Sequence, residues 1–473
     1  MSSTLMISVS GMRGIVGTDL TPELVARHAA ALGAWAVAGG RPRAVLGRDA
    51  RTSGPMFAHA AIAGFMSVGC DVIDLGLVPT PTTQLAVEHH QAGAGLILTA
   101  SHNPIEWNAL KLVGPDGVFL DAESGAAVRA LAESGPKRVG WDGLGRVTAD
   151  PDAIRRHLDL VLALPQVDVE LIRQAGFTVA LDCVRGAGGA IIPELLERLG
   201  CTVAGINLET DGRFPREPEP IPENLGQLAE LVRTSGAEIG MAVDPDVDRL
   251  ALVDELGTPI GEDYTLAFAV RAVLRETGRR EDGKAGGSSG EIPSSRRPVL
   301  PPTVVANLST SLVVEDAATS GGARFVRAPV GEAHVARVIK DERAVIGGEG
   351  NGGVILPELH IGRDAPLGVA LILQYLAREK RTVSALVGGA PQYRIVKAKF
   401  QRGADLRAAY RAVKARFPDA QADERDGLRL AWQGRWVHLR PSGTEPVIRI
   451  IAEASSEADA VRLLEEVRTL LQA

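Results

Sequence analysis

The stretch that decides the fold begins with FTVALDC (177–183), a short apolar segment typical of a β-strand. A segment with helical spacing follows (GAIIPELLERLG, 189–200), and then a second strand (CTVAGIN, 201–207), a second helix (LGQLAELVRTSG, 225–236) and a third strand with a polar end (EIGMAVDPDVD, 238–248). Strands that alternate with helices predict a mainly parallel sheet covered by helices. We therefore expect one βαβαβ unit here.

The same order of elements occurs once before this stretch and once after it. The earlier copy runs from RAVLGRD (43–49) to GLILTAS (95–101), and the later one from TVVANLS (303–309) to AVIGGEGNGG (344–353). The spacing of the elements repeats, although few residues are identical. A chain of 473 residues is also too long for one ordinary core and suits three or four domains.

The last hundred residues follow a different pattern, with a helix before a run of strands and another helix after it. The expected elements are a helix at 404–416, strands at 428–432, 435–440 and 446–454, and a helix at 456–472. We therefore expect an α/β protein in which three repeated βαβαβ mixed-sheet domains and a smaller C-terminal α+β domain surround a central cleft. The predicted domains are 1–148, 149–254, 255–374 and 375–473. A Gly/Ser/Pro-rich segment at 278–298 predicts a flexible surface insertion.

Composition excludes several classes of function. The net charge is −7 with acidic and basic residues interspersed, which disfavours nucleic acid as a partner. The sequence contains no run of about 18 apolar residues, so we predict no membrane-spanning helix. Cys70, Cys183 and Cys201 border apolar strands without a CxxC pair, so we expect buried free thiols. With no signal-peptide pattern at the N-terminus, these features predict a cytoplasmic protein.

Each repeated unit ends in an unusual polar sequence: TASHNP (99–104), DPDVDR (244–249) and GEGNGG (348–353). Parallel sheets bind ligands beyond the carboxyl ends of their strands, so we expect these three loops to face one cleft. The GxGxxG spacing in the third loop is a weak dinucleotide signal, because Pro357 interrupts any helix after it. Glu349 and Asn351 in that loop suit the hydroxyl groups of a ligand, although a glycine-rich strand connection is the alternative.

Asp244, Asp246 and Asp248 alternate along the chain, so in a strand-like conformation they share one face. Three carboxylates on one face repel one another unless a divalent cation neutralises them, and hard oxygen ligands indicate Mg²⁺. A solvated acidic loop is the alternative. A calcium loop is excluded because Arg249 occupies the position that requires glycine and strands flank the motif.

Ser101 ends a buried strand and is expected to face the cleft, where His102 could donate a hydrogen bond to a phosphate. A capped turn explains the same residues equally well. Lys111, ten residues further on, suits acid–base chemistry if a nearby cation lowers its pKa, and is otherwise a solvated strand lysine. Arg13 lies between glycines, which permits close approach of an anion, or it is a surface arginine.

A fourth loop, RPSGTEP (440–446), combines a guanidinium, two hydroxyls and a glycine. This combination is typical of a phosphate-binding nest, and Arg449 would add to its charge. An ordinary tight turn is the alternative for this loop.

Taken together and in this order, these four motifs resemble those of the α-D-phosphohexomutases, over essentially the whole chain. GEGNGG (348–353) departs from the GEMSGH-like loop of many members and is similar to a variant found in some archaeal-type and related bacterial mutases. The resemblance implies an enzyme that interconverts hexose 6-phosphate and hexose 1-phosphate through a phosphoserine and a bisphosphate. It also implies Mg²⁺, a hexose 1,6-bisphosphate activator, a small sugar phosphate as the only partner class, and a monomer or homodimer.

The resemblance assigns roles to residues by motif position. Ser101 would be the phosphoserine and would complete the metal site of Asp244, Asp246 and Asp248. The other catalytic residues would be His102, Lys111, Arg13 and Arg249. The substrate would contact Glu349, Asn351, His334, Arg440, Ser442, Gly443, Thr444 and Arg449.

The nature of the sugar is indicated by one position. Gly443 gives the phosphate loop the Gly-Thr-Glu-Pro ending that is similar to phosphoglucosamine mutases, whereas glucose and mannose mutases more often carry Asn there. We therefore expect conversion of glucosamine 6-phosphate to glucosamine 1-phosphate, with mannose or glucose phosphates as the alternative. Two competing classes are a Mg²⁺-dependent phosphatase that uses the same serine and a non-enzymatic sugar-phosphate sensor, which would need neither Ser101 nor the aspartates.

We expect Asp246→Asn to abolish mutase turnover and to leave the fold intact, because the substitution removes one charge that would hold the cation. Turnover of a hexose phosphate and the far-UV circular dichroism spectrum of the variant measure these two effects. Unchanged turnover would contradict the assignment of the aspartates to a metal site.

Overall fold

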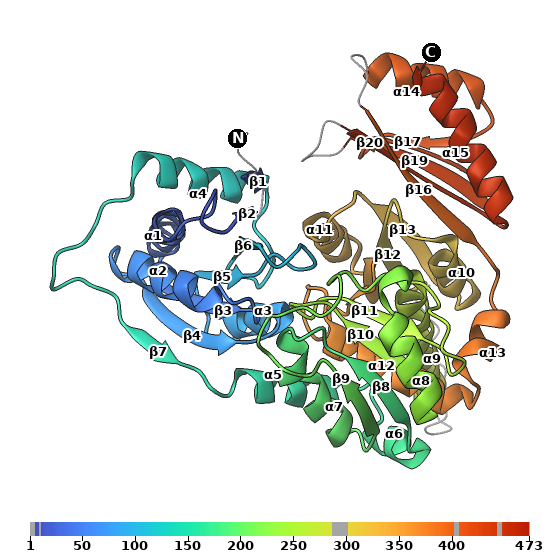
Figure 1. Cartoon of the computed structure of the whole chain (residues 1–473), viewed down its shortest axis with the longest axis horizontal. Coiled ribbons are helices and arrows are strands. Elements are labelled where there is room, and N and C mark those ends of the chain that lie inside the picture. Colours follow the sequence, from blue (N-terminus) through green and yellow to red (C-terminus); the bar gives the residue numbers. More distant parts are fainter. Residues whose placement is uncertain (1–4, 9–10, 286–300, 402–405, 442–446, 473) are drawn as a thin grey trace.

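A computed structural model describes residues 5–8, 11–285, 301–401, 406–441 and 447–472 (Figure 1). Within these ranges the strands form four sheets, of seven, four, four and five strands. The first three sheets follow the three predicted repeats in the sequence, and the last belongs to the C-terminal part of the chain. The predicted α/β class with a C-terminal α+β domain is confirmed.

The first sheet has the strand order β1-β2-β6-β5-β3-β4-β7. Its strands are β1 (Met6–Ser8), β2 (Gly11–Ile15), β3 (Arg43–Arg48), β4 (Asp71–Leu77), β5 (Ala94–Leu98), β6 (Trp107–Val113) and β7 (Val147–Ala149). The helices of this part are α1 (Pro22–Ala38), α2 (Gly54–Met66), α3 (Thr80–His89) and α4 (Ala122–Ser134).

The second sheet has the order β11-β10-β8-β9 and the third the order β13-β12-β14-β15. The second contains β8 (Thr178–Asp182), β9 (Thr202–Ile206), β10 (Ile239–Val243) and β11 (Leu250–Val253), with α5 (Ala153–Leu162), α6 (Val169–Ala175), α7 (Ile192–Arg198) and α8 (Gly226–Ser235). The third contains β12 (Thr303–Asn307), β13 (Arg324–Ala328), β14 (Ile346–Glu349) and β15 (Gly353–Ile355), with α9 (Asp263–Ala285), α10 (Leu312–Ser320), α11 (Glu332–Glu342), α12 (Ala365–Glu379) and α13 (Val383–Gly388).

One topology recurs in these three sheets. In β4-β3-β5-β6, β9-β8-β10-β11 and β13-β12-β14-β15, the first three strands are parallel and the fourth is antiparallel. The three signature loops therefore occupy the same place in each sheet, between the third parallel strand and its antiparallel neighbour. The sequence pattern predicted the parallel strands. The structure adds the antiparallel strand that follows each loop and runs back along the sheet.

The fourth sheet is entirely antiparallel, in the order β16-β20-β19-β18-β17, and lies beside the third sheet (Figure 1). Its strands are β16 (Arg394–Gln401), β17 (Gln421–Asp423), β18 (Leu428–Trp432), β19 (Arg435–Pro441) and β20 (Val447–Ala454), and its helices are α14 (Leu406–Arg416) and α15 (Glu457–Gln472). The sequence analysis missed β16 and β17. Apolar residues of both helices pack against β18, β19 and β20 to form a separate core.

The second and third sheets share one continuous core, in which α12 is central. The helix is buried from Ala365 to Ala377, as expected for a helix that is apolar all round. The predicted domain boundary between residues 374 and 375 lies within this helix, and the domain boundaries remain predictions. No helix among the described residues has the length and apolar character needed to cross a membrane.

Two further predictions concern the insertion and the cysteines. Helix α9 continues to Ala285, so the first part of the 278–298 segment is helical rather than a flexible insertion. Residues 286–300 lie outside the described part of the chain. Cys70 and Cys183 are buried free thiols as predicted, and Cys201 is a half-buried one. Burial raises the pKa of Cys70 to about 12 and that of Cys201 to about 11, which makes both poor nucleophiles.

Gly64 sets the close packing of α2 on α1. A Cβ atom at Gly64 would lie 2.3 Å from the backbone oxygen of Ala26 on α1. We expect Gly64→Ala to push the helices apart and to lower the free energy of unfolding by about 1–3 kcal/mol. The midpoint of urea-induced unfolding measures the effect.

Gly388→Ala is the matched control, because Gly388 is also helical and a Cβ atom there meets nothing within 4 Å. This variant should be neutral or slightly more stable, since alanine restricts the unfolded chain. Equal midpoints for the two variants would show that the α1–α2 contact does not require glycine.

Candidate active site

The three aspartates converge through a tight turn rather than through the pleat of a strand. Strand β10 ends at Val243, and the N–H of Val247 donates to the carbonyl oxygen of Asp244 at 3.1 Å. Val247 has a positive φ of 63°, a conformation that non-glycine residues adopt rarely. The turn points the backbone N–H groups of Asp248 and Arg249 at Asp244 Oδ1, at 3.2 and 3.3 Å. The three carboxylates do lie close together, as the sequence predicted, but a turn brings them together and not the alternation of side chains along a strand.

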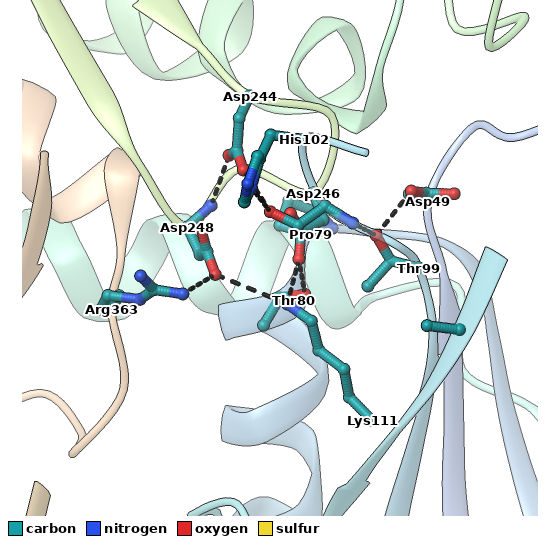
Figure 2. Close-up of polar contacts among 12 residues, drawn as sticks. Asp49, Pro79, Thr80, Thr99, His102, Lys111, Asp244, Asp246, Asp248 and Arg363 are labelled. Atoms are coloured by element: carbon teal, nitrogen blue, oxygen red, sulfur yellow. Dashed lines mark hydrogen bonds and ion pairs between the residues drawn. The ribbon is translucent and has the colours of Figure 1, made fainter. Parts of the chain in front are cut away.

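The other two carboxylates are each held by one oxygen only (Figure 2). Asp246 Oδ2 accepts hydrogen bonds from Thr80 Oγ1 at 2.6 Å and from Lys111 Nζ at 2.7 Å. Asp248 Oδ2 accepts one from the Arg363 guanidinium at 2.6 Å. Oδ1 of Asp246 and Oδ1 of Asp248 are buried without a hydrogen-bond partner. Buried carboxylate oxygens are costly when unpaired, so this arrangement suits a further ligand.

This site fits a divalent cation. One carboxylate oxygen from each of Asp244, Asp246 and Asp248 lies within 4.8 Å of the others, and all three residues are fully buried. Burial and the neighbouring aspartates raise the pKa of Asp244. Burial also acts to raise the pKa of Asp246, but Lys111 and Thr80 together outweigh it, so this pKa is lowered. A cation bound among the unpaired oxygens would relieve this repulsion, and an all-oxygen donor set suits Mg²⁺.

Ser101 meets the aspartates from the first sheet. It follows β5 in a turn, has a positive φ of 48° and is almost fully buried. Its Oγ donates a hydrogen bond to Asp244 Oδ2 at 2.8 Å and lies 3.3 Å from His102 Nδ1. A single contact thus joins the serine loop of the first sheet to the aspartate loop of the second.

Arg51 holds the serine loop in this conformation, and the sequence analysis missed it. Its guanidinium donates to the carbonyl oxygens of Ser101 and Asn103, each at 2.6 Å. It also donates to the carbonyl oxygens of Pro104 at 2.7 Å and Trp107 at 2.8 Å. Because Arg51 is buried, these bonds fix the backbone on both sides of the serine.

Asp49 completes this support, with its carboxylate 3.3 Å from Arg51 Nε and accepting a hydrogen bond from Thr99 Oγ1 at 2.6 Å. The available signal was the polar end of the first predicted strand, RAVLGRD (43–49), because β3 is the parallel neighbour of β5. The ends of neighbouring parallel strands meet at one edge of a sheet, so residues after β3 were candidates for the serine loop.

Two predicted catalytic residues have different protonation states: Lys111 is charged and His102 is neutral. Burial lowers the pKa of Lys111, but Asp246 and Asp248 outweigh this effect, so its pKa is raised. Carboxylates surround this ammonium and keep it charged, and the lowered pKa expected next to a cation stays a prediction. Burial, with Arg249, lowers the pKa of His102 to about 2, so its imidazole is neutral at pH 7.

Two predicted arginines border the serine and the aspartates. Arg13 on β2 donates to the side-chain oxygen of Asn103 at 3.2 Å, which places it at the serine loop. Arg249 Nε lies 3.7 Å from Asp248 Oδ1, and its guanidinium also contacts Glu219 at 3.4 Å. Arg13 therefore lies at the serine loop and Arg249 beside the aspartates.

Glu349 lies at the end of β14 and is buried. Its Oε1 accepts hydrogen bonds from Asn307 Nδ2 at 2.9 Å and from the N–H of Gly331 at 3.0 Å. Its Oε2 accepts one from Arg363 at 2.9 Å. Since Arg363 also contacts Asp248, this predicted sugar ligand is connected to the aspartate loop through a single side chain.

The rest of the predicted sugar site is less closely connected. Asn351 uses its side-chain oxygen to accept from the N–H of Gly353 at 3.3 Å, which closes its own loop. Strand β15, and not a helix, follows this loop, so the GxGxxG spacing is not a dinucleotide site. His334 is exposed on the first turn of α11.

The predicted phosphate nest belongs to the fourth sheet. Arg440 Nε lies 3.0 Å from Asp426 Oδ1 and 2.8 Å from its Oδ2, and Arg440 pairs with Arg449 across β19 and β20. Asp426 Oδ2 accepts from the N–H of Val330 at 3.0 Å, which joins this sheet to the third. Ser442, Gly443 and Thr444 lie outside the described residues.

Comparison with known families identifies the class of protein. The models described as phosphoglucomutase/phosphomannomutase match residues 5–138 (alpha/beta/alpha domain I), 155–257 (domain II), 262–393 (domain III) and 396–470 (C-terminal domain). With all four domains present, the protein is an enzyme of the α-D-phosphohexomutase class. The chain belongs to the phosphoglucomutase/phosphomannomutase family.

Individual relatives have similar length and architecture. A phosphoglucomutase/phosphomannomutase of Thermococcus kodakarensis is 38% identical, with 96% of each chain covered. A protein of Methanopyrus kandleri named as a probable phosphoglucosamine mutase is 37% identical over 97% of this chain and 95% of its own. A phosphoglucomutase/phosphomannomutase family protein of Burkholderia thailandensis has the same fold, with a TM-score of 0.84, 24% identity and coverage of 99% and 98%.

We expect Arg51→Lys to lower turnover by about tenfold or more, because small displacements of a reactive group can cost up to about a hundredfold. Lysine keeps the charge but cannot donate to four carbonyl oxygens at once. Steady-state kinetics on a hexose phosphate measures the loss. Arg43→Lys is the control, since Arg43 lies at the start of β3, is exposed and makes one long side-chain bond, to the carbonyl oxygen of His90. Equal activity in both variants would contradict the role of Arg51.

Proposed function

We propose that this protein is a phosphohexomutase in which Ser101 carries the transferable phosphoryl group. The observation that supports this assignment is the 2.8 Å contact between Ser101 Oγ and Asp244, beside two buried carboxylate oxygens without partners. A serine hydroxyl next to a cation site and two arginines is suited to phosphoryl transfer.

The reaction has two transfers that mirror each other. In the first, the bond between phosphorus and Ser101 Oγ breaks and a bond to a free sugar hydroxyl oxygen forms; that hydroxyl loses its proton, and Ser101 Oγ takes up a proton to become a hydroxyl. The resulting hexose bisphosphate turns around in the site. In the second transfer, the Ser101 hydroxyl loses its proton and attacks the other phosphate, the bond between that phosphorus and the sugar oxygen breaks, and the released sugar oxygen takes up a proton. A hexose 1,6-bisphosphate would also phosphorylate a resting enzyme, and thereby activate it.

Asp244, Asp246 and Asp248 would hold Mg²⁺, together with the phosphate on Ser101. The cation would neutralise negative charge on the phosphoryl group that is transferred. Arg249 and Arg13 add positive charge from the protein side.

His102 and Lys111 are the proposed proton carriers. His102 is neutral and adjacent to Ser101 Oγ. A phosphate on that serine would carry ~2 negative charges, which would raise the pKa of the His102 imidazole. It then accepts the proton of the attacking sugar hydroxyl. Lys111 is charged and donates a proton to the oxygen that is released, in keeping with its raised pKa.

The two ends of the sugar must exchange places, so one set of groups has to accept either phosphate. Arg440 and Arg449, with the loop residues Ser442, Gly443 and Thr444, are proposed to bind the non-reacting phosphate. Glu349, Asn351 and His334 are proposed to bind the sugar. A site in which the phosphate supplies most of the binding energy tolerates both orientations.

Glucosamine phosphate is the proposed sugar. The Gly443 signature supports it, and so do relatives named as probable phosphoglucosamine mutases in Methanopyrus kandleri and Methanosarcina acetivorans, the latter 36% identical. The alternative, mannose or glucose phosphate, is supported by the phosphoglucomutase/phosphomannomutase of Thermococcus kodakarensis.

We expect kcat/KM, measured with Mg²⁺ and a hexose bisphosphate, to be highest for glucosamine phosphate among glucosamine, mannose and glucose phosphates. Ser101→Ala should abolish turnover of all three, whereas Ser134→Ala, at the exposed end of α4, should change nothing. Preference for mannose or glucose phosphate would overturn the assignment of glucosamine phosphate as the substrate, but not the proposed phosphoryl transfer through Ser101. Release of inorganic phosphate without any bisphosphate requirement would indicate a phosphatase instead.

A further inference from the structure

Arg363 lies where the aspartate loop and the predicted sugar loop come together. It precedes α12 by two residues and is buried, although its side chain is charged. The sequence motifs predicted no role for it. A buried arginine is retained only where several groups compensate its loss of hydration.

The Arg363 side chain contacts three carboxylates in three directions. Its Nε donates to Glu332 at 3.0 Å, one terminal nitrogen donates to Glu349 at 2.9 Å, and the other donates to Asp248 at 2.6 Å (Figure 2 shows the last contact). Its backbone N–H also donates to Glu332 at 3.2 Å. The planar, forked guanidinium is the side-chain cation that can satisfy such a set.

Gly353, the last glycine of the predicted sugar loop, makes room for this arginine. A Cβ atom at Gly353 would lie 2.2 Å from Arg363 Cδ and 2.8 Å from its Cγ. The glycine spacing that resembled a dinucleotide signal therefore has a packing reason at this position. The loop and the arginine are fitted to each other.

The backbone beside Arg363 is fixed by groups from distant parts of the chain. Asp364 caps α12 by accepting from the N–H of Leu367 at 2.9 Å. Its other carboxylate oxygen contacts Nε2 of His157 at 2.8 Å and of His360 at 2.9 Å. His157 also contacts Thr82 on α3 at 2.8 Å. The start of α12 is thus anchored to α5 and, through it, to α3, which limits movement of Arg363.

We propose that Arg363 is a positioning residue that couples the metal-binding carboxylate Asp248 to the sugar-binding carboxylate Glu349. This inference rests on the proposed function of those two residues. Arg363 holds Asp248 Oδ2, which leaves Oδ1 without a hydrogen bond and able to hold a cation, and it holds Glu349 Oε2 at the same time. A change at the sugar carboxylate is therefore transmitted to the metal site through this one guanidinium.

The direction of the coupling follows from charge. Arg363 interacts with three carboxylates at once. When the charge on Glu349 is removed, the interaction of Arg363 with Asp248 becomes stronger. Asp248 then binds a cation less well. Any effect of Glu349 through space remains when Arg363 is replaced, whereas the transmitted effect disappears.

A double-mutant cycle of Glu349→Gln and Arg363→Lys tests the coupling, with Mn²⁺ binding measured by electron paramagnetic resonance in the absence of sugar. Lysine keeps the charge but ends near the Cζ position, so it cannot reach all three carboxylates. We expect Glu349→Gln to weaken Mn²⁺ binding about tenfold in the wild-type background and about twofold or less in the Arg363→Lys background, in line with coupling energies of contacting residues.

Arg378→Lys is the matched control, because Arg378 lies at the far end of α12 and also joins two carboxylates, Glu276 at 3.1 Å and Asp168 at 3.2 Å. In that background Glu349→Gln should keep its full effect. An equal effect of Glu349→Gln in the wild-type and Arg363→Lys backgrounds would overturn the coupling alone. Failure of the wild-type protein to bind Mn²⁺ would overturn both the coupling and the proposed metal site.

A second cycle keeps the proposal testable if Arg363→Lys does not fold, as judged by circular dichroism. Glu332→Gln and Glu349→Gln each free part of the same guanidinium, and Glu332 has no proposed role with metal or sugar. Their combined effect on Mn²⁺ affinity should differ from the product of the single effects by about threefold or more, since they share a partner. Independent effects would contradict the proposal.

Discussion

The structure depends on the burial of three carboxylates in one turn. Asp244, Asp246 and Asp248 are fully buried, and burial together with their mutual repulsion raises the pKa of Asp244. Cations on all sides compensate this charge: Lys111 from the first sheet, Arg249 from the loop itself and Arg363 from the segment before α12. The neighbouring domains therefore meet at the aspartate loop, because each contributes part of the positive charge that the loop requires.

The repeated topology explains how these loops find one another. In each of the first three sheets, a signature loop connects the third parallel strand to an antiparallel fourth strand. One loop contributes the Ser101 hydroxyl, one the three aspartates and one the buried Glu349, so a single structural unit supplies three different chemical groups. The fourth sheet adds arginines and is joined to the third by contacts such as that of Asp426 with Val330.

Local residues made part of the site predictable. Ser101 and the three aspartates stand in short motifs whose chemistry is evident from residue type and spacing, and the strand–helix alternation predicted that they follow strands. Arg51 and Arg363 could not be predicted in this way, since their partners lie about 50 and 115 positions away in the sequence. The direction of the Lys111 pKa shift could not be predicted either, because it depends on which charges the fold places around the ammonium.

The sequence by itself determined the strand–helix alternation of the three repeats and the four signature loops, because these follow from hydrophobic periodicity and from contiguous residues. The tertiary structure decided which oxygen atoms remain without partners, which cation faces which carboxylate, and how Glu349 is connected to the aspartates. These features arise from contacts between residues far apart in the chain, and burial sets the strength of each charge interaction only after the domains have packed.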